Sequence, residues 1–328
     1  MSFLLRGVAA AGGVRVIAAD TTKLVEEART RHDASPTAAA ALGRSLTAAL
    51  LLSHVLLKNP EDRLTMRFRG DGPLGGIIAD AGLDGGVRGY THNPQVYLEP
   101  REDGKLNVGR AVGQGDLEVI RSHAPYGDPY SSSVRLVSGE IAEDVAMFLA
   151  MSEQIGSAVL LGVYLEEGKV TRAGGVILQA LPDAKEGALG LLEANVKALG
   201  QLTDAMRRMS LLEVVHELTW GMEFELLTKN ALPLRFECRC SDEKALDAVA
   251  YFSLEERESM IEEDGGAEAV CHWCNEKRWL TPEQIRGLSA REEIRCPDCD
   301  TLWFREGQAT MIRESELCAC GRTVNLPS

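Results

Sequence analysis

The chain has 328 residues, of which 45% are hydrophobic, so it can bury a substantial core and is long enough for two or more domains. Acidic residues outnumber basic ones by 49 to 35, which gives a formal net charge of −14. This charge argues against nucleic acid as a partner, because phosphate binding requires clustered Lys and Arg.

The N-terminal segment predicts a hairpin and then helices. Residues 1–20 alternate in polarity around a Gly-Gly break, which indicates a β-hairpin. They carry Arg6 too early for a secretory signal, and we expect a cytoplasmic protein without a membrane span. A short helix is expected over 21–30, and Ser35 before a proline predicts the start of a second helix ending near Leu57. That helix is apolar nearly all round, which favours a buried core helix.

Residues 63–180 are rich in predicted strands. Short alternating or apolar runs indicate strands, and a helix is expected over 138–152. The strands are expected near 64–68, 77–80, 87–90, 95–98, 117–122, 132–136, 158–165 and 174–180. The glycine-rich segment 70–76 resembles a phosphate cradle but lacks the Lys-Ser/Thr of a P-loop, so a sharp turn is the better interpretation. We therefore predict an α+β core domain over 1–182, with a mostly antiparallel sheet and core helices.

Residues 183–235 are predicted to form amphipathic linker helices and connecting strands. Apolar residues step by three or four along one expected helix. They are Leu189, Leu192, Val196, Leu199, Leu202 and Met206. Ser210 is expected to cap a second helix, 211–218, and strands are expected over 224–236. Such a stripe is most often plain core, and the alternative is a surface covered in one state and exposed in another.

All eight cysteines lie at or after Cys238, which favours a reducing compartment and metal sites. Cys238 with Cys240, and Cys271 with Cys274, form two tight pairs that are typical of a tetrahedral zinc site. Neighbouring thiols can also oxidise, so such a site can act as a switch. The surrounding region, 236–287, looks helical between the pairs and is too small to fold unaided, so we expect it to require the metal.

A second quartet of cysteines lies in the tail, residues 288–328. Its members are Cys296, Cys299, Cys318 and Cys320. Their spacing predicts a zinc-ribbon-like extension with a second structural zinc, while a redox or unpaired role is the alternative. Acidic residues outnumber basic ones seven to five there, which disfavours a nucleic-acid ribbon. Spacing alone does not settle the pairing across the two quartets.

Other candidate residues have simpler structural interpretations. His272, between two cysteines, is expected to be an exposed bystander, and His54 a core residue with satisfied hydrogen bonds. Glu140, Glu143 and Asp144 suit a helix N-terminus better than acid–base catalysis. A Ser-His-Asp or Cys-His motif is not visible, so we expect no catalytic residues and no enzyme.

Several stretches together resemble the heat-shock protein 33 family of redox-regulated holdase chaperones. The resemblance covers about residues 1–287 and does not include the tail. It rests on 70–76 (GDGPLGG), 87–90 (VRGY), 106–110 (LNVGR), 138–144 (SGEIAED) and the first cysteine quartet.

The resemblance implies that the reduced protein holds one zinc through Cys238, Cys240, Cys271 and Cys274 and is inactive. Oxidation would release zinc and form Cys238–Cys240 and Cys271–Cys274 disulfides. The activated form, typically a homodimer, would then expose apolar surface, including the linker stripe, and hold unfolding client proteins without ATP during oxidative stress. The alternatives are a thiol-disulfide oxidoreductase, although the thioredoxin-type βαβ context is missing, and a zinc-ribbon adaptor protein.

Overall fold

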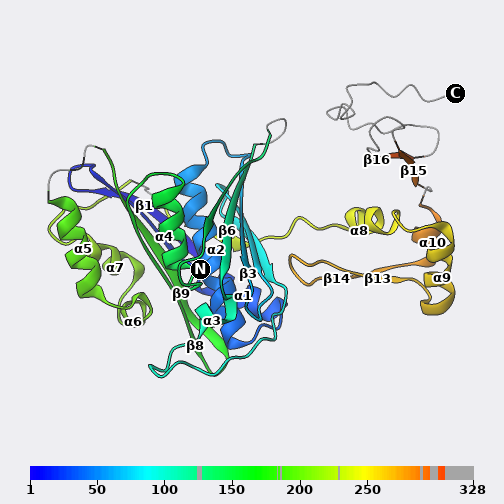
Figure 1. The fold of residues 1–328 in the computed structure, drawn as a ribbon, viewed down its shortest axis with the longest axis horizontal. Coiled ribbons are helices and arrows are strands. Elements are labelled where there is room, and N and C mark those ends of the chain that lie inside the picture. The colour runs from blue at the N-terminus through cyan, green and yellow to red at the C-terminus, as the bar shows by residue number, and fades with distance from the viewer. Residues whose placement is uncertain are drawn as a thin grey trace. The chain divides into compact units, whose positions relative to one another are not determined.

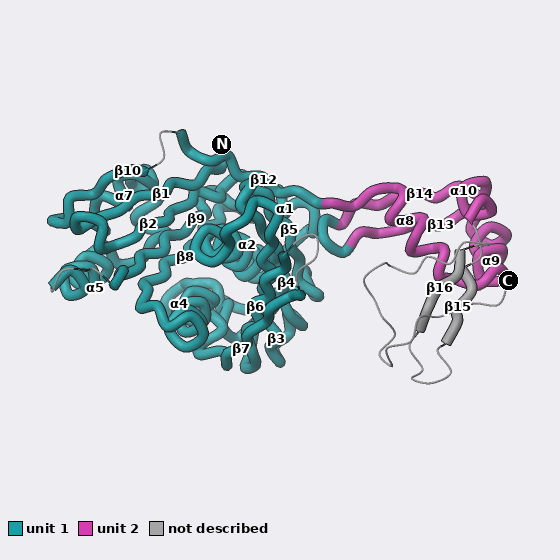
Figure 2. Tube along the Cα trace, turned by 90° about the horizontal axis from the view of Figure 1, so that it is seen from above, with its two compact units in different colours: residues 1–238, 272–274 teal, residues 239–271, 275–328 magenta. Residues whose placement is uncertain are grey.

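We describe the protein from a computed structural model. It describes residues 1–123, 128–182, 184, 187–227 and 230–288, and the backbone of 291–295 and 302–306. The chain divides into two compact units, shown in different colours in Figure 2. The first comprises residues 1–238 with 272–274, and the second comprises 239–271 with the residues from 275 onward.

The first unit contains two six-stranded sheets rather than the single sheet that we expected. One sheet has the order β10-β1-β2-β9-β8, with β11 also paired to β1. Its strands are β1 (Phe3–Ala9), β2 (Val14–Asp20), β8 (Ser157–Glu166), β9 (Lys169–Ala180), β10 (Glu225–Leu226) and β11 (Leu232–Pro233). The predicted hairpin at the N-terminus is β1–β2.

The other sheet has the order β12-β5-β4-β3-β6-β7. Its strands are β3 (Arg63–Gly70), β4 (Ile77–Gly82), β5 (Gly86–Thr91), β6 (Gly115–Ser122), β7 (Tyr130–Arg135) and β12 (Arg235–Phe236). Neighbouring strands pair antiparallel, except that β12 runs parallel to β5. The α+β fold with mostly antiparallel strands is therefore confirmed.

The long helix α2 (Pro36–Leu56) explains why there are two sheets. It contacts β4 and β5 of one sheet and β8 and β9 of the other, so its apolar surface is covered on both sides. Ser35 caps it as predicted, because its Oγ accepts a hydrogen bond from the Ala38 amide at 3.3 Å. The helix is long and apolar enough to cross a membrane, but 78% of its apolar window is buried inside the protein.

His54 near the end of α2 corrects one prediction. Neither ring nitrogen has a hydrogen-bond partner within the described residues, so His54 is not a satisfied core histidine. Burial, reinforced by the charge of Arg6 and opposed by Asp84, lowers the pKa of His54 to about 4. The ring is therefore neutral at pH 7.

The segment 95–98 is not a strand, contrary to our expectation. Backbone carbonyls in and just before this segment instead accept hydrogen bonds from Ser35, the residue that caps α2. The Ser35 hydroxyl donates to the Val96 carbonyl, and the Ser35 amide donates to the Pro94 carbonyl at 2.8 Å. These contacts with a distant residue hold the segment outside both sheets.

The glycine-rich segment 70–76 forms a turn, and most of its amides donate hydrogen bonds within the protein. The Gly72 amide donates to Val112 and the Leu74 amide to Ala111, both in the short helix α3 (Val108–Val112), which the sequence did not predict. A Cβ at Gly70 would lie 1.9 Å from the Val112 carbonyl oxygen, so glycine permits this contact. The turn interpretation is confirmed.

Two further helices belong to this unit, α1 (Thr22–Arg31) and α4 (Ala142–Met151), both near their expected positions. Asp144 is fully buried and its carboxylate accepts hydrogen bonds from four amides ahead of and at the start of α4. The donors are Val137, Ser138, Gly139 and Ile141. Glu140 pairs with Arg44 at 2.6 Å. Asp144 thus stabilises the start of α4, as expected, whereas Glu140 pairs with an arginine of α2.

Three helices cover the outer face of the first sheet (Figure 1). They are α5 (Ala188–Leu199), α6 (Leu202–Arg208) and α7 (Leu211–Leu218). The single predicted helix over 189–206 is wrong, because Gly200 adopts a φ of 72° and separates α5 from α6. The predicted apolar stripe nevertheless continues from α5 into α6. Its buried members are Leu192, Leu202 and Met206, and its partly buried members are Val196 and Leu199. Leu189 is exposed.

The second unit is built from short elements. They are α8 (Asp242–Val249), α9 (Leu254–Asp264), β13 (Ala267–Val270), β14 (Lys277–Leu280) and α10 (Pro282–Arg286), followed by the paired strands β15 (Arg291–Arg295) and β16 (Leu302–Glu306). Its buried apolar cluster comprises Val249, Ile261, Leu280 and Ile285. Cys296, Cys299, Cys318 and Cys320 lie outside the described residues.

Candidate metal centre

The first cysteine pair follows the last strand of the first unit. Phe236 of β12 pairs with Val87 of β5, and the Glu237 amide donates to the Val87 carbonyl at 2.8 Å. This pairing fixes the chain immediately before Cys238. Beyond Cys240, the Ser241 hydroxyl caps α8 by accepting from the Lys244 amide at 3.2 Å.

The second pair lies in the turn of the β13–β14 hairpin. The Cys271 amide donates to the Glu276 carbonyl at 2.9 Å, and the Asn275 amide donates to the Cys271 carbonyl at 2.7 Å. Asn275 has a φ of 58°, a left-handed conformation that asparagine tolerates better than most residues. The tight turn brings Cys271 and Cys274 to one side.

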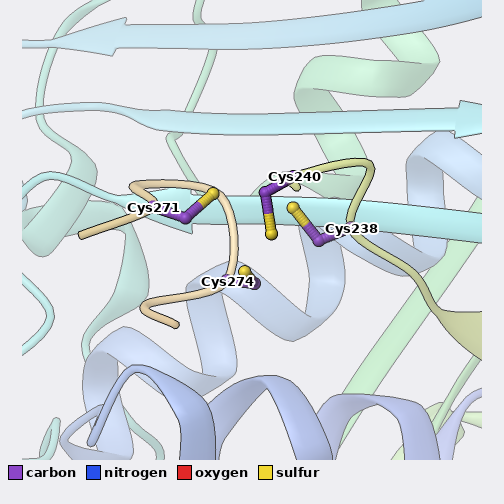
Figure 3. Close-up of side chains that lie close together, drawn as sticks. All are labelled: Cys238, Cys240, Cys271 and Cys274. Carbon is purple, nitrogen blue, oxygen red and sulfur yellow. The ribbon is translucent and has the colours of Figure 1, made fainter. Parts of the chain in front are cut away.

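The four sulfur atoms lie within 4.8 Å of one another, and the side chains converge on a common point (Figure 3). A tetrahedral zinc site with Zn–S bonds of about 2.3 Å has sulfur–sulfur edges of about 3.8 Å. Cys274 is buried and the other three are half-buried. Four reduced cysteines at this spacing fit a tetrahedral site for a soft metal ion such as zinc.

The guanidinium of Arg278 lies beside the cysteine cluster. Nη2 of Arg278 lies 3.6 Å from Sγ of Cys240, and its guanidinium also pairs with Asp242 and with Glu276 at 2.9 Å. The Cys240 thiol, followed by the Asp242 carboxylate, holds the pKa of Arg278 above its usual value. A permanent positive charge at this distance favours the thiolate form of Cys240, which is the form that binds metal.

Trp273 fixes the second pair through contacts that the sequence did not predict. Cζ of Arg88 lies 4.2 Å from the Trp273 ring centroid, and the Tyr90 ring makes an edge-on contact at 5.5 Å. Nε of Arg88 in turn bonds to the buried Asp80 at 3.1 Å. A tryptophan inside a C-x-x-C knuckle is the one sequence signal that would have suggested such an anchor.

His272 is exposed and is not one of the four residues of the cluster, in agreement with the bystander interpretation. Its ring lies 6.2 Å from that of Tyr90. The cluster thus consists of cysteines alone. An all-cysteine set is typical of structural sites, since catalytic zinc sites usually have three protein ligands and an open position.

The architecture is that of an α+β protein with two six-stranded sheets that both contact α2, and a four-cysteine centre in the C-terminal part of the chain. The chain matches the Hsp33 protein family over residues 2–281 and belongs to that family of chaperones. It is 53% identical to the 33 kDa chaperonin of Thermus thermophilus, over 100% of this chain and 98% of the relative. It is 50% identical to the 33 kDa chaperonin of Deinococcus radiodurans, over 88% of this chain and 98% of the relative.

A solved structure agrees with the sequence relatives. The crystal structure of the 33 kDa chaperonin (heat shock protein 33 homolog) from Thermotoga maritima superimposes with a TM-score of 0.79 at 33% identity, covering 87% of this chain and 96% of that chain. The tail lies beyond the family match at residue 281, yet the Thermus relative matches this chain over its whole length. The tail is therefore shared by some relatives rather than peculiar to this chain.

Proposed function

We propose that the protein is a redox-regulated, ATP-independent holdase of the cytoplasm, inactive while reduced and zinc-bound. The gathering of Cys238, Cys240, Cys271 and Cys274 in a chain of the Hsp33 family carries this proposal. Bound zinc would keep the four sulfurs as thiolates, which are the forms that react with oxidants. The domain scheme that we propose is a core at 1–182, a linker at 183–235, a switch at 236–287 and an extension at 288–328.

The chemistry of activation follows from the two close pairs. Cys238 and Cys240 lose two electrons to one molecule of peroxide, which leaves as two molecules of water, and one disulfide forms. Cys271 and Cys274 react in the same way with a second molecule. A disulfide sulfur is no longer a thiolate ligand, so the four-sulfur set that holds the metal is lost.

Loss of the metal would destabilise the second unit. Among the described residues of this unit, the buried cluster comprises four side chains, Val249, Ile261, Leu280 and Ile285, with partly buried neighbours. A core of this size rarely supports folding without a metal or disulfide staple. Structural zinc contributes on the order of 10 kcal/mol to folding in such modules.

The segment leading to Cys238 supports a route from the cysteines to the linker. β10, β11 and β12 are two-residue strands at sheet edges, and they connect α7 to Cys238. Strands this short add few ladder hydrogen bonds, so they depend on their ends being fixed. We propose that releasing Cys238 loosens them and exposes the apolar stripe of α5 and α6 to unfolding clients. The activated form is proposed to be a homodimer.

The test combines metal release with an aggregation assay. Peroxide at mildly raised temperature should release zinc, measured with a chromogenic chelator, and should switch on suppression of aggregation of a thermally unfolding client. Equal suppression by the fully reduced, zinc-loaded protein would refute the switch. Catalytic turnover of insulin reduction would favour a thiol-disulfide oxidoreductase instead.

A further inference from the structure

The face of the second sheet that points away from α2 has a hollow beside the glycine-rich segment 70–76. The hollow has a volume of about 450 Å³. Four of the side chains that line it are those of Arg67 and Arg69 from β3, Ile78 from β4, and His92, the residue that follows β5. All four belong to the first unit, and none of them belongs to the cysteine cluster.

The strand register explains why these side chains share one face. Phe68 is buried in the core, so its neighbours Arg67 and Arg69 project from the opposite face of β3. Ile78 is directly opposite Arg67 in the pairing of β3 with β4, so it lies on that same face. His92 follows a buried residue at the end of β5 and is itself exposed, which continues the alternation.

A missing side chain leaves the hollow open. Gly76 lies beside His92, whose amide donates to the Gly76 carbonyl at 3.2 Å. A Cβ at Gly76 would lie 3.5 Å from two atoms of the His92 ring, so a longer side chain there would compete for the same space. Gly76 has a φ of 117°, which residues with a side chain rarely adopt. The backbone therefore requires glycine at this point of the lining.

Three hydrogen-bond donors of the lining have no partner among the described residues. Nε of Arg67 is buried and makes no hydrogen bond there. The amide of Gly76 and the side-chain amide of Gln114 likewise donate to no other group in the described part of the chain. Buried donors without partners are rare in proteins, and a ligand that brings acceptor atoms would satisfy these three.

The charges around the hollow favour a ligand with a single negative charge. Arg67 and Arg69 share one carboxylate, that of Glu118, at 3.6 Å and 2.8 Å. Asp71 also lines the hollow, and its carboxylate accepts a hydrogen bond from the Gln114 amide at 2.7 Å. A monoanion can therefore take Arg67 while Glu118 keeps Arg69. A dianion would bring more negative charge than the two guanidiniums balance.

The rest of the lining selects the body of the ligand. The hollow is far larger than a bare carboxylate group and has Ile78 on one side. The ring of His92 is held in place, because its Nδ1 donates to the Gly75 carbonyl at 2.5 Å and its face lies 5.6 Å from the ring of Tyr90. A fixed ring next to an aliphatic side chain suits a flat aromatic group.

We propose that the hollow binds a small aromatic monocarboxylate, whose carboxylate pairs with Arg67 and whose ring packs on Ile78 and His92. The planar guanidinium fork matches a carboxylate through two parallel hydrogen bonds, which gives the site its preference for this group. The inference does not depend on the proposed redox switch, since the lining residues all lie in the first unit.

The test uses the full-length, reduced, zinc-loaded protein and para-trifluoromethylbenzoate, whose binding is followed by fluorine NMR. We expect saturable binding with a Kd of about 0.1–1 mM for a ligand of this size. Arg67→Gln should weaken binding at least tenfold, because it removes the guanidinium that has an unused Nε. Arg135→Gln, at an exposed arginine of the same sheet that pairs with Asp116, is the matched control and should bind like the wild type.

A variant of the competing carboxylate gives a readout that misfolding cannot imitate. Glu118→Gln frees Arg67 and Arg69 from their shared partner, so it should strengthen binding at least threefold. This measurement keeps the proposal falsifiable even if Arg67→Gln fails to fold.

Related probes test the chemical class of the ligand. The uncharged para-trifluoromethylbenzamide, the ring-free trifluoroacetate and the more highly charged para-trifluoromethylphenyl phosphate should each bind at least tenfold more weakly than the benzoate. The proposal is overturned if any of the three binds as tightly as the benzoate. It is also overturned if Arg67→Gln folds and binds like the wild type, or if Glu118→Gln does not strengthen binding.

Discussion

The guanidinium of Arg88 lies over the ring of Trp273, with its Cζ 4.2 Å from the ring centroid. Trp273 is adjacent to Cys274, and Arg88 is held from behind by the buried carboxylate of Asp80. Asp80 also pairs with Arg63 at 2.7 Å, so the cation under the tryptophan belongs to a fixed network rather than to a mobile surface chain. Trp273 and the adjacent Cys274 are thereby anchored on β5.

Replacing this tryptophan should make the metal centre easier to open. Trp273→Ala removes a cation–π contact of about 0.5–2 kcal/mol and an edge-on aromatic contact. We expect zinc to leave for a chelator several-fold faster and activation to need less peroxide. Stopped-flow measurement with a chromogenic chelator checks the rate. Trp220→Ala, which removes a tryptophan that is 72% exposed, is the matched control and should leave the rate unchanged; equal rates for both variants would show that Trp273 does not anchor the site.

Removing the metal should unfold one unit and spare the other. After chelation under reducing conditions, α8, α9 and α10 should lose protection from hydrogen exchange, because their buried cluster is small without the metal. Strands β3, β4 and β5 should keep their protection, because they pack on α2 in a large core. Exchange measured by mass spectrometry distinguishes the two. Persistent protection of α9 in the metal-free protein would contradict the metal-dependent folding of the second unit.

The sequence predicted those parts of the fold that depend on residues close together in the chain, such as helix caps and apolar runs. The cap at Ser35 and the apolar composition of the following residues located α2 closely. The alternation at 95–98 was misleading, because these residues are used by Ser35, far away in the chain. The helical period through Leu199 and Leu202 concealed the break at Gly200, since both sides of the break pack on the same sheet.

For the candidate metal centre, too, the sequence predicted the short-range features but not the contacts with distant residues. Cysteine spacing predicted which four cysteines gather in one cluster, because each pair lies within one short turn. The spacing contained no information about Arg88, Tyr90 or Arg278. Which cation lies beside Cys240, and which surface receives Trp273, depends on how distant strands are placed, and a single sequence does not state this.

Metal stoichiometry tests the prediction for the tail. If Cys296, Cys299, Cys318 and Cys320 form a zinc ribbon, the reduced protein should contain two zinc ions per chain by atomic emission spectroscopy. A double variant, Cys296→Ser with Cys318→Ser, should then contain one and should still release it to peroxide. One zinc in the wild type would instead support a redox or unpaired role for these cysteines.

The buried imidazole of His54 predicts a pH dependence of stability. Its pKa is lowered from 6.5 to about 4 in the folded protein, mainly by burial. The unfolded chain therefore binds more protons than the folded protein between these two pH values. This histidine's contribution to stability is complete above pH 6.5 and is lost as the pH drops toward 4, by at most about 3 kcal/mol.

The variant His54→Leu tests this. It removes two buried nitrogens that have no partner among the described residues, and should raise the free energy of unfolding at pH 7 by about 1–2 kcal/mol. It should also flatten the decline between pH 6.5 and 4 in urea unfolding curves of the zinc-loaded protein. His216→Gln, at an exposed position of α7, is the control, and an unchanged pH profile in His54→Leu would show that another group causes the decline.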